Sequence, residues 1–250
     1  MISAGDAIRA MGNLPIVPLE VITNAKPMLI LAPHADDETL GCGGLIAAAA
    51  AAGHPPFVLI LTDGTGSHPN SPSFPPARLK ALREQEARSA VGILGLTDGC
   101  IGFLGLRDTA APMEGEHFDA AVAAIISTAS SVGAVCIAAP WQHDPHCDHL
   151  AAHRMVAAAA ARCGVRHLAY PVWGWTLPPD AQLPGSAPSG MRLDITDHLD
   201  AKRRAIAAHA SQYGGLINDD PQGFRLPQGL LEIFSRPFET FLTVDDPTAE

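Results

Sequence analysis

Short apolar runs alternate with longer stretches of helical character along most of the 250-residue chain. A short apolar run is typical of a strand that is buried on both faces, and the alanine-rich stretches between the runs favour helices. The predicted strands span residues 28–33, 57–62, 100–104, 134–139, 167–172 and 191–195. The predicted helices span residues 39–52, 77–94, 118–130, 150–163 and 197–212. This alternation predicts an α/β protein with a Rossmann-like three-layer fold, in which helices flank a mainly parallel sheet.

The length and composition are those of one large globular domain. The chain has 47% hydrophobic and 17% charged residues, which is enough to build a substantial core. We expect a single domain over residues 1–250, with a motif-bearing core at about 28–212 and an irregular segment at 213–250. The glycines of Gly41-Cys42-Gly43-Gly44 lie at a predicted helix start, where small residues permit close packing. They do not form a Gly-x-Gly-x-x-Gly fingerprint, so the Rossmann-like sheet does not imply NAD.

Charge and cysteine usage narrow the classes of partner. A net charge of −10 argues against a general nucleic-acid-binding protein, although one local arginine could still hold a phosphorylated substrate. The five cysteines are dispersed, which favours reduced thiols and a cytoplasmic protein. No signal peptide is evident, and the longest apolar stretch, residues 45–52, is too short to span a membrane. We therefore expect a cytoplasmic protein that acts on a small molecule, and the sequence leaves a homo-oligomer open.

An imidazole and three carboxylates follow the first predicted strand within five positions, as His34-Ala35-Asp36-Asp37-Glu38. In α/β proteins, ligands bind outside the carboxyl ends of the strands. Two adjacent aspartates repel each other when both are ionised, so a nearby cation would explain them. His34 and Asp37 are ligand types that suit zinc. The structural alternative is a helix N-cap at Asp36 or Asp37, with Glu38 beside the helix dipole.

A second cluster follows the fourth predicted strand, where four of the chain's 11 histidines fall within residues 143–153. If a helix begins here, His149 and His153 lie one above the other on the same face. The pair has the spacing of a His-Glu-x-x-His site, but Leu150 stands where the glutamate would be. The second cluster therefore offers metal ligands without the usual base.

Asp144 and Asp148 interleave these histidines and are candidates to orient them by accepting ring N–H groups. A charge on a surface loop is an equally good interpretation of Asp144. Spacing alone leaves open which member of each pair is a metal ligand: Asp36 or Asp37, and His149 or His153.

Together the two clusters resemble the motifs of the LmbE-like family, also called the PIG-L family of N-acetylglucosaminyl de-N-acetylases. The family motifs are His-Pro-Asp-Asp-Glu and His-x-Asp-His, here His34–Glu38 and His146–His149. Further matches extend the resemblance over roughly residues 28–212. They are Arg83-Glu84-Gln85-Glu86 through Leu94-Gly95, Phe103-Leu104-Gly105 with Asp108, and Lys202 through His209-Ala210-Ser211-Gln212. Ala35 replaces the usual proline and Cys147 stands where proline is frequent, which removes a rigid ring from each loop but no ligand.

The resemblance implies a zinc site formed by His34, Asp37 and His149, with Fe²⁺ or another divalent ion as alternatives. It implies that Asp36 is the general base, which takes a proton from metal-bound water. It also implies that His146, in its protonated form, stabilises the oxyanion together with the metal.

The resemblance also makes Arg83 the candidate for substrate binding, because family members place this arginine near the ligand. Its guanidinium could hold a phosphate or sugar hydroxyls. The alternative is an ion pair with Glu84 or Glu86 on the same predicted helix. The loops at residues 63–76 and 173–190 follow strand ends, so we expect them to form the walls of an open cleft with Arg83.

The function expected from these features is a metal-dependent amidohydrolase, a zinc-dependent N-deacetylase, that removes an acetyl group from an amino sugar or its conjugate. Trp141, Trp173 and Trp175 are candidates to stack on the sugar ring, and core packing is the favoured alternative for at least one of them. One alternative is a magnesium- or manganese-dependent phosphoesterase, which the carboxylates of residues 36–38 favour and the histidines oppose. A second alternative is a non-catalytic sugar- or metal-binding protein, which Asp36 opposes because binding alone needs no base.

Overall fold

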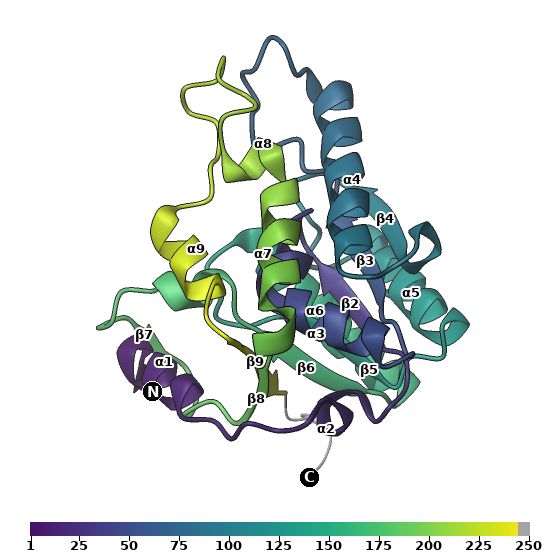
Figure 1. Cartoon of the computed structure of the whole chain (residues 1–250), viewed down its shortest axis with the longest axis vertical. Helices are drawn as coiled ribbons and strands as arrows, with labels where there is room; N and C mark the ends of the chain where they lie inside the picture. Colours follow the sequence, from purple (N-terminus) through teal and green to yellow (C-terminus); the bar gives the residue numbers. More distant parts are fainter. Residues whose placement is uncertain (245–250) are drawn as a thin grey trace.

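The structure, a computed structural model, describes residues 1–244 (Figure 1). Its strands are β1 (Ile2–Ser3), β2 (Leu29–Ala32), β3 (Phe57–Thr62), β4 (Ile101–Leu106), β5 (Cys136–Pro140), β6 (Arg166–Tyr170), β7 (Gln182–Leu183), β8 (Gly190–Asp194) and β9 (Phe238–Thr243). Its α-helices are α1 (Ala4–Gly12), α2 (Leu19–Thr23), α3 (Asp37–Ala51), α4 (Pro76–Ile93), α5 (Glu116–Ser131), α6 (Cys147–Cys163), α7 (Leu199–Ala208), α8 (Ala210–Tyr213) and α9 (Gln228–Phe234).

The central sheet has seven strands within residues 1–244, in the order β4-β3-β2-β5-β6-β9-β8. The strands from β4 to β6 run parallel, whereas β9 pairs antiparallel with both β6 and β8. β1 and β7 form a separate antiparallel pair. The predicted mainly parallel sheet is confirmed.

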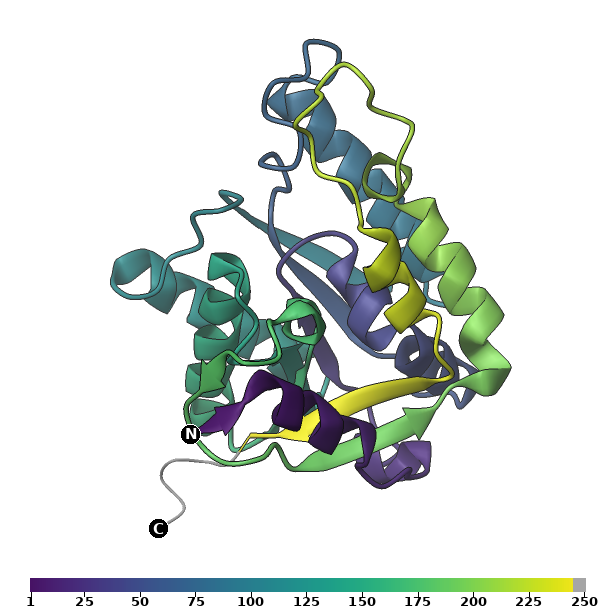
Figure 2. The same cartoon turned by 90° about the vertical axis from the view of Figure 1, so that its left-hand side faces the viewer.

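Helices cover both faces of the sheet, which confirms the predicted three layers (Figure 2). Helices α3, α4 and α7 pack on one face, and α5 and α6 pack on the other. Along β2, Ile30 and Ala32 belong to the first core and Leu29 and Leu31 to the second. Because successive side chains of a strand point to opposite faces, a strand covered on both sides must be apolar throughout.

The small residues at the start of α3 allow close packing, as the sequence predicted. A Cβ on Gly41 would lie 2.2 Å from the Tyr170 ring, and one on Gly44 would lie 2.4 Å from the Ile195 side chain. These approaches seat α3 against β6 and the segment before α7. They fix the position of the helix whose first turn carries Asp37.

The order of the strands reverses between β2 and β5. The chain adds β3 and β4 on one side of β2, then returns to add β5 and β6 on the other. Helices that follow two such strands diverge to opposite faces, which leaves a crevice at the carboxyl ends of the strands. His34 follows β2, and His146 immediately precedes α6, which follows β5. The topology thus brings the two predicted clusters to one crevice.

The prediction that residues 213–250 are irregular was wrong for the part that the structure describes. This segment contains α9 and β9, and β9 lies inside the sheet between β6 and β8. Its prolines flank these elements, because Pro227 is the N-cap of α9 and Pro237 directly precedes β9. Proline is tolerated at such boundaries, so its frequency was a poor guide to the elements between. Residues 245–250 lie outside the described part of the chain.

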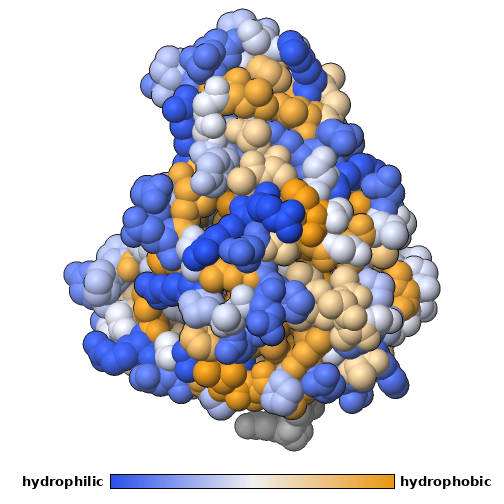
Figure 3. Space-filling model, viewed as in Figure 1, coloured by the Kyte–Doolittle hydropathy of each residue, from blue (hydrophilic) through white to orange (hydrophobic). Residues whose placement is uncertain are grey.

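The molecular surface mixes residues of different character. On the face shown in Figure 3, hydrophilic and hydrophobic residues are interspersed in small areas. Among the helices of residues 1–244, none is both long and apolar enough to cross a membrane.

Candidate active site

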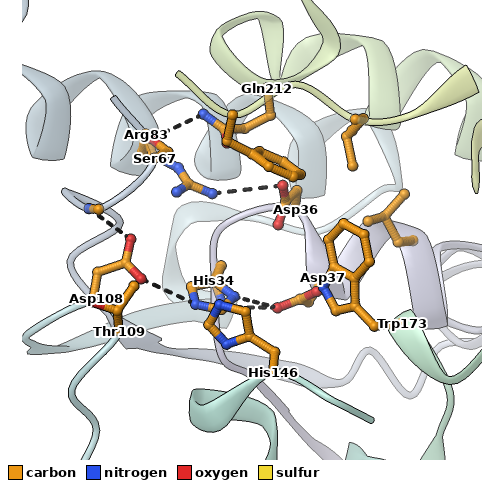
Figure 4. A pocket seen from close by; sticks show the side chains of 14 residues that line it. His34, Asp36, Asp37, Ser67, Arg83, Asp108, Thr109, His146, Trp173 and Gln212 are labelled. Atoms are coloured by element: carbon orange, nitrogen blue, oxygen red, sulfur yellow. Dashed lines mark hydrogen bonds and ion pairs between the residues drawn. The ribbon is translucent and has the colours of Figure 1, made fainter. Parts of the chain in front are cut away.

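A pocket of about 580 Å³, including its open mouth, lies at the crevice between β2 and β5 (Figure 4). Its lining includes six residues with a predicted role, namely His34, Asp36, Asp37, Arg83, His146 and Trp173. Figure 4 shows His34, Asp37 and His146 together on one side, with Asp36 and Arg83 above them. The histidines, aspartates and arginine of this set come from three separate segments of the chain, which therefore meet in one place.

His34, Asp37 and His149 converge on one carboxylate oxygen. Asp37 Oδ2 lies 3.1 Å from His34 Nδ1 and 3.2 Å from His149 Nε2. The His34 ring is nearly buried, and Asp37 and His149 are buried. Among residues 1–244, His149 Nε2 has no hydrogen-bond partner of acceptable geometry, although it is buried. The other histidine of the pair, His153, directs its Nδ1 to Pro140 O at 3.0 Å, so the structure favours His149 as the ligand.

The contacts of the two histidines fit a cation at this point. His149 Nδ1 lies 3.0 Å from Asp144 Oδ2, and a neutral ring that donates its Nδ1–H there turns its Nε2 lone pair toward Asp37. His34 Nε2 lies 3.1 Å from Asp148 Oδ2, and a neutral ring that donates its Nε2–H there turns its Nδ1 lone pair toward the same oxygen. Two lone pairs and a carboxylate oxygen repel one another unless a positive charge lies among them. One carboxylate and two imidazoles form a donor set suited to zinc.

The charge of the site favours a cation in a second way. Burial lowers the pKa of His149, but the Asp37 and Asp144 carboxylates outweigh this effect and raise it to about 9. The surrounding carboxylates therefore favour a positive charge at His149. Without a metal a proton on the ring supplies this charge, and a bound metal would supply it instead.

Asp144 and Asp148 are buried, and each lies within hydrogen-bond distance of one of the two histidines. Asp144 also accepts the backbone N–H groups of Val172, Trp173 and Gly174, at 2.7–3.0 Å. Asp148 accepts those of Thr109 and Ala111 at 2.7 and 2.9 Å. The alternative interpretation of Asp144 as a surface charge is wrong, because its side chain is fully buried.

Asp36 is buried beside His34, Asp37 and His149. Its backbone has a φ angle of +150°, a conformation that residues with a Cβ seldom adopt. Burial raises the pKa of its carboxyl to about 7, and the adjacent Asp37 charge adds to this effect while Arg83 opposes it. Its carboxylate lies 3.6 Å from the Arg83 guanidinium. A buried carboxylate with a raised pKa next to two imidazoles and a second carboxylate is suited to accept a proton.

His146 forms the N-cap of α6, and its Nδ1 accepts the backbone N–H of Asp148 at 3.2 Å. Burial and the neighbouring His34 lower the pKa of His146, which opposes the expectation that it is protonated. A neutral ring whose Nδ1 accepts must carry its proton on Nε2. His146 can therefore donate a hydrogen bond in the pocket without a positive charge.

Arg83 is buried and already bonded within the protein. It donates to Ala35 O at 2.8 Å and to Gly64 O at 3.1 Å, besides its ion pair with Asp36. The alternative of an ion pair on its own helix is wrong, because Glu84 pairs with Lys80 and Glu86 accepts from Ser211. Arg83 also lines the pocket, where a substrate could reach it. Its role in substrate binding stays a prediction.

The two loops expected to form the walls of the pocket contribute only some of its lining residues. The loop after β3 contributes Gly66 and Ser67, and the loop after β6 contributes Trp173. Of the other two tryptophans, Trp141 is buried in the core beneath α1 and Trp175 is half-buried. Trp173 packs edge-on against Phe224, with 5.8 Å between ring centroids.

Sequence reasoning gave no site role to six further lining residues, Leu40, Asp108, Thr109, Gln212, Phe224 and Leu226. Asp108 and Gln212 lie in the segments that carry the family resemblance, so the resemblance could have identified them as site residues. Phe224 and Leu226 lie in the segment expected to be irregular. Hydrogen bonds from Asn70 and Ser71 to Asp220 and Asp219 join that segment to the loop after β3. Such long-range bonding leaves no local sequence signal.

Comparison with known proteins places this geometry in a family. Residues 29–160 match the family model PIG-L, described as GlcNAc-PI de-N-acetylase. The 1D-myo-inositol 2-acetamido-2-deoxy-alpha-D-glucopyranoside deacetylase of Rhodococcus opacus is 30% identical over 242 residues, covering 75% of this chain and 82% of its own. The 2'-N-acetylparomamine deacetylase of Streptomyces fradiae is 29% identical over 153 residues, covering 57% of this chain and 55% of its own.

Solved structures share the fold. A conserved protein from Thermus thermophilus is 25% identical, with a TM-score of 0.63 over 89% of this chain and 98% of its own. The N,N'-diacetylchitobiose deacetylase from Pyrococcus horikoshii is 20% identical, with a TM-score of 0.64 over 86% of this chain and 82% of its own. The family model covers more than half of the chain and includes both histidine–aspartate clusters. The chain therefore belongs to the PIG-L family of GlcNAc-PI de-N-acetylases.

Proposed function

We propose that this protein is a zinc-dependent hydrolase that removes the N-acetyl group of an amino sugar or an amino-sugar conjugate. The observation that carries the proposal is the convergence of His34, Asp37 and His149 on one point beside the buried carboxylate of Asp36. The named relatives act on acetylated amino sugars, which supports the same class of substrate here.

His34, Asp37 and His149 would hold the metal, which supplies Lewis acidity toward the amide carbonyl and makes an attacking water more acidic. Asp36 accepts the proton of that water as the water attacks the carbonyl carbon. His146 donates its Nε2–H to the oxygen on which negative charge develops. Asp36 then returns the proton to the departing nitrogen, so the products are acetate and the free amine of the sugar.

The pocket has the mixed character that a sugar requires. Trp173 and Phe224 offer apolar ring surfaces, while Asp108, Ser67 and Gln212 offer hydrogen-bonding groups. Sugars have apolar faces and polar edges, so they bind where aromatic rings and polar side chains meet. This arrangement supports an acetamido sugar as the substrate.

An activity screen with the zinc-loaded protein tests this proposal. We expect amine release, followed with fluorescamine, from N-acetylglucosamine and diacetylchitobiose and from an inositol conjugate of N-acetylglucosamine. The conjugates should react faster than the free sugar, because binding of the remote group helps to position the amide. Release of phosphate from a phosphoester at this site, without amine release from any acetamido sugar, would replace the proposal with a phosphoesterase.

The choice of metal ligands is tested by two histidines on α6. His149→Ala should bind zinc at least about 100-fold more weakly, because one of three protein ligands is lost. His153→Ala is the matched control: it lies one turn further along the helix, contacts Pro140 O, and should retain zinc. Zinc content is measured by mass spectrometry and affinity by competition with a chelator. Equal zinc loss in both variants would contradict the assigned ligand set.

A further inference from the structure

The backbone of Asp36 is held in its strained conformation by its neighbours in the chain. The φ angle of +150° lies outside the regions that residues with a Cβ prefer. Glu38 Oε2 accepts the Asp36 N–H at 2.9 Å, and Thr39 Oγ1–H donates to Asp36 O at 2.8 Å. A strained residue persists where its surroundings impose the conformation, and such residues cluster at functional sites.

Glu38 connects this turn to a distant part of the chain. Its other oxygen, Oε1, accepts the Nε2–H of His209 at 3.0 Å. Both side chains are fully buried, and His209 lies at the break between α7 and α8. Because its oxygens are both engaged inside the protein, the Glu38 carboxylate acts on the protein backbone and not on a ligand. The sequence left open an interaction of Glu38 with the dipole of α3. The hydrogen bonds of Glu38 to Asp36 and His209 are a more specific role than that interaction.

The same junction between α7 and α8 has a second connection to Asp36. Ser211 donates its backbone N–H and its hydroxyl to Glu86 of α4, at 2.7 and 2.6 Å. Helix α4 also carries Arg83, which donates to Ala35 O and lies 3.6 Å from the Asp36 carboxylate. The junction therefore reaches the Asp36 backbone through Glu38 and the Asp36 side chain through α4.

We propose that Glu38 and His209 are positioning residues that hold Asp36 in the orientation needed for proton transfer. The inference rests on the proposed function of Asp36 as the general base. Loss of the Glu38 acceptor leaves the buried Asp36 N–H unpaired, and the turn relaxes toward an unstrained φ. The carboxylate then moves relative to the attacking water, while His34 and His149 keep their positions.

Variants of Glu38 distinguish the effect of its hydrogen bonds on kcat from the effect of its buried charge. Glu38→Ala should lower kcat by about 100-fold, the cost of a displacement of about 1 Å, with KM and zinc affinity nearly unchanged. Glu38→Gln keeps an oxygen for the Asp36 N–H and an N–H₂ group for a neutral His209, so it should restore most of the lost rate. Glu38→Asp keeps the charge but is too short to reach both partners, so it should be slow.

Two further variants control for a purely structural role. Glu86→Ala removes a buried glutamate at the same junction, whose two oxygens both accept from Ser211. It should lower the melting temperature about as much as Glu38→Ala without a comparable loss of kcat, because its connection to Asp36 is only indirect. Glu38→Ala combined with His209→Ala should be no slower than Glu38→Ala alone, because the two residues act through one contact.

A crystal structure of each Glu38 variant supplies a readout that is independent of activity. We expect the φ angle of Asp36 to relax in Glu38→Ala, or in Glu38→Asp if the alanine variant does not fold, and to stay near +150° in Glu38→Gln. Wild-type kcat in a folded, zinc-loaded Glu38→Ala or Glu38→Asp protein would overturn the inference, as would a loss of rate matched by an equal loss of zinc. An inactive wild-type protein in which these variants still relax Asp36 would instead count against the proposed function alone.

Discussion

Asp36→Asn should retain zinc and lose about 10²–10⁴-fold in kcat, the range that a general base contributes. The substitution preserves the shape of the side chain and one oxygen near Arg83, but an amide does not accept the proton of the attacking water. The ligand atoms of His34, Asp37 and His149 are unchanged, so metal binding should persist. The turnover number and the zinc content are measured on the same preparation.

Asp63→Asn is a suitable control for this experiment. Asp63 also follows a strand of the sheet, β3, and its carboxylate accepts the backbone N–H and the hydroxyl of Thr65 at 3.0 and 2.8 Å. The substitution tests whether the loss of any carboxylate at this edge slows the reaction. A kcat for Asp36→Asn close to that of Asp63→Asn would remove Asp36 from the role of base.

Asp144→Ala should lower the free energy of unfolding by about 3–5 kcal/mol, as expected when a buried charged partner is removed. The fully buried carboxylate accepts four N–H groups, from the His149 ring and from three consecutive backbone positions after β6. Without it, these donors are buried and unpaired, which costs free energy at each one. The effect should be seen in urea unfolding of the metal-free protein.

The same variant should bind zinc about 10–100-fold more weakly, because Asp144 contacts the ring of His149, the proposed ligand. Asp194→Asn serves as the control: its exposed carboxylate accepts the backbone N–H and the hydroxyl of Thr196, and Asp194 does not line the pocket. It should change the free energy of unfolding by no more than about 0.5 kcal/mol. Wild-type stability and zinc affinity in Asp144→Ala would show that Asp144 neither supports the fold nor orients His149.

The sheet and the two motif clusters could be predicted because their signals are local. A strand buried on both faces must be continuously apolar, so β2 and β3 were visible as short runs. Parallel strands place their carboxyl ends at one edge, so the clusters after β2 and β5 were expected to lie near each other. Helix α6 begins three residues earlier than predicted, because His146 supplies an N-cap that an apolar pattern does not reveal.

The choice between neighbouring residues required the tertiary structure. His149 and His153 have the same spacing signal, but one faces Asp37 and the other faces Pro140 O. Asp36 and Asp37 are adjacent, and only the strained turn separates a carboxylate that faces two imidazoles from one that faces Arg83. Spacing in the sequence indicates which residues share a helix face. The geometry of a ligand set depends on which residues from other segments lie opposite that face.

The sequence by itself determined the fold class and the residue types of the site, because apolar periodicity and motif order are properties of short segments. The tertiary structure decided the partners of Arg83, the link from His209 through Glu38 to Asp36, and the wall formed by Phe224 and Leu226. It also decided the place of β9 inside the sheet. Each of these contacts joins residues far apart in the chain, and their energies depend on burial and alignment, which arise only when the chain has folded.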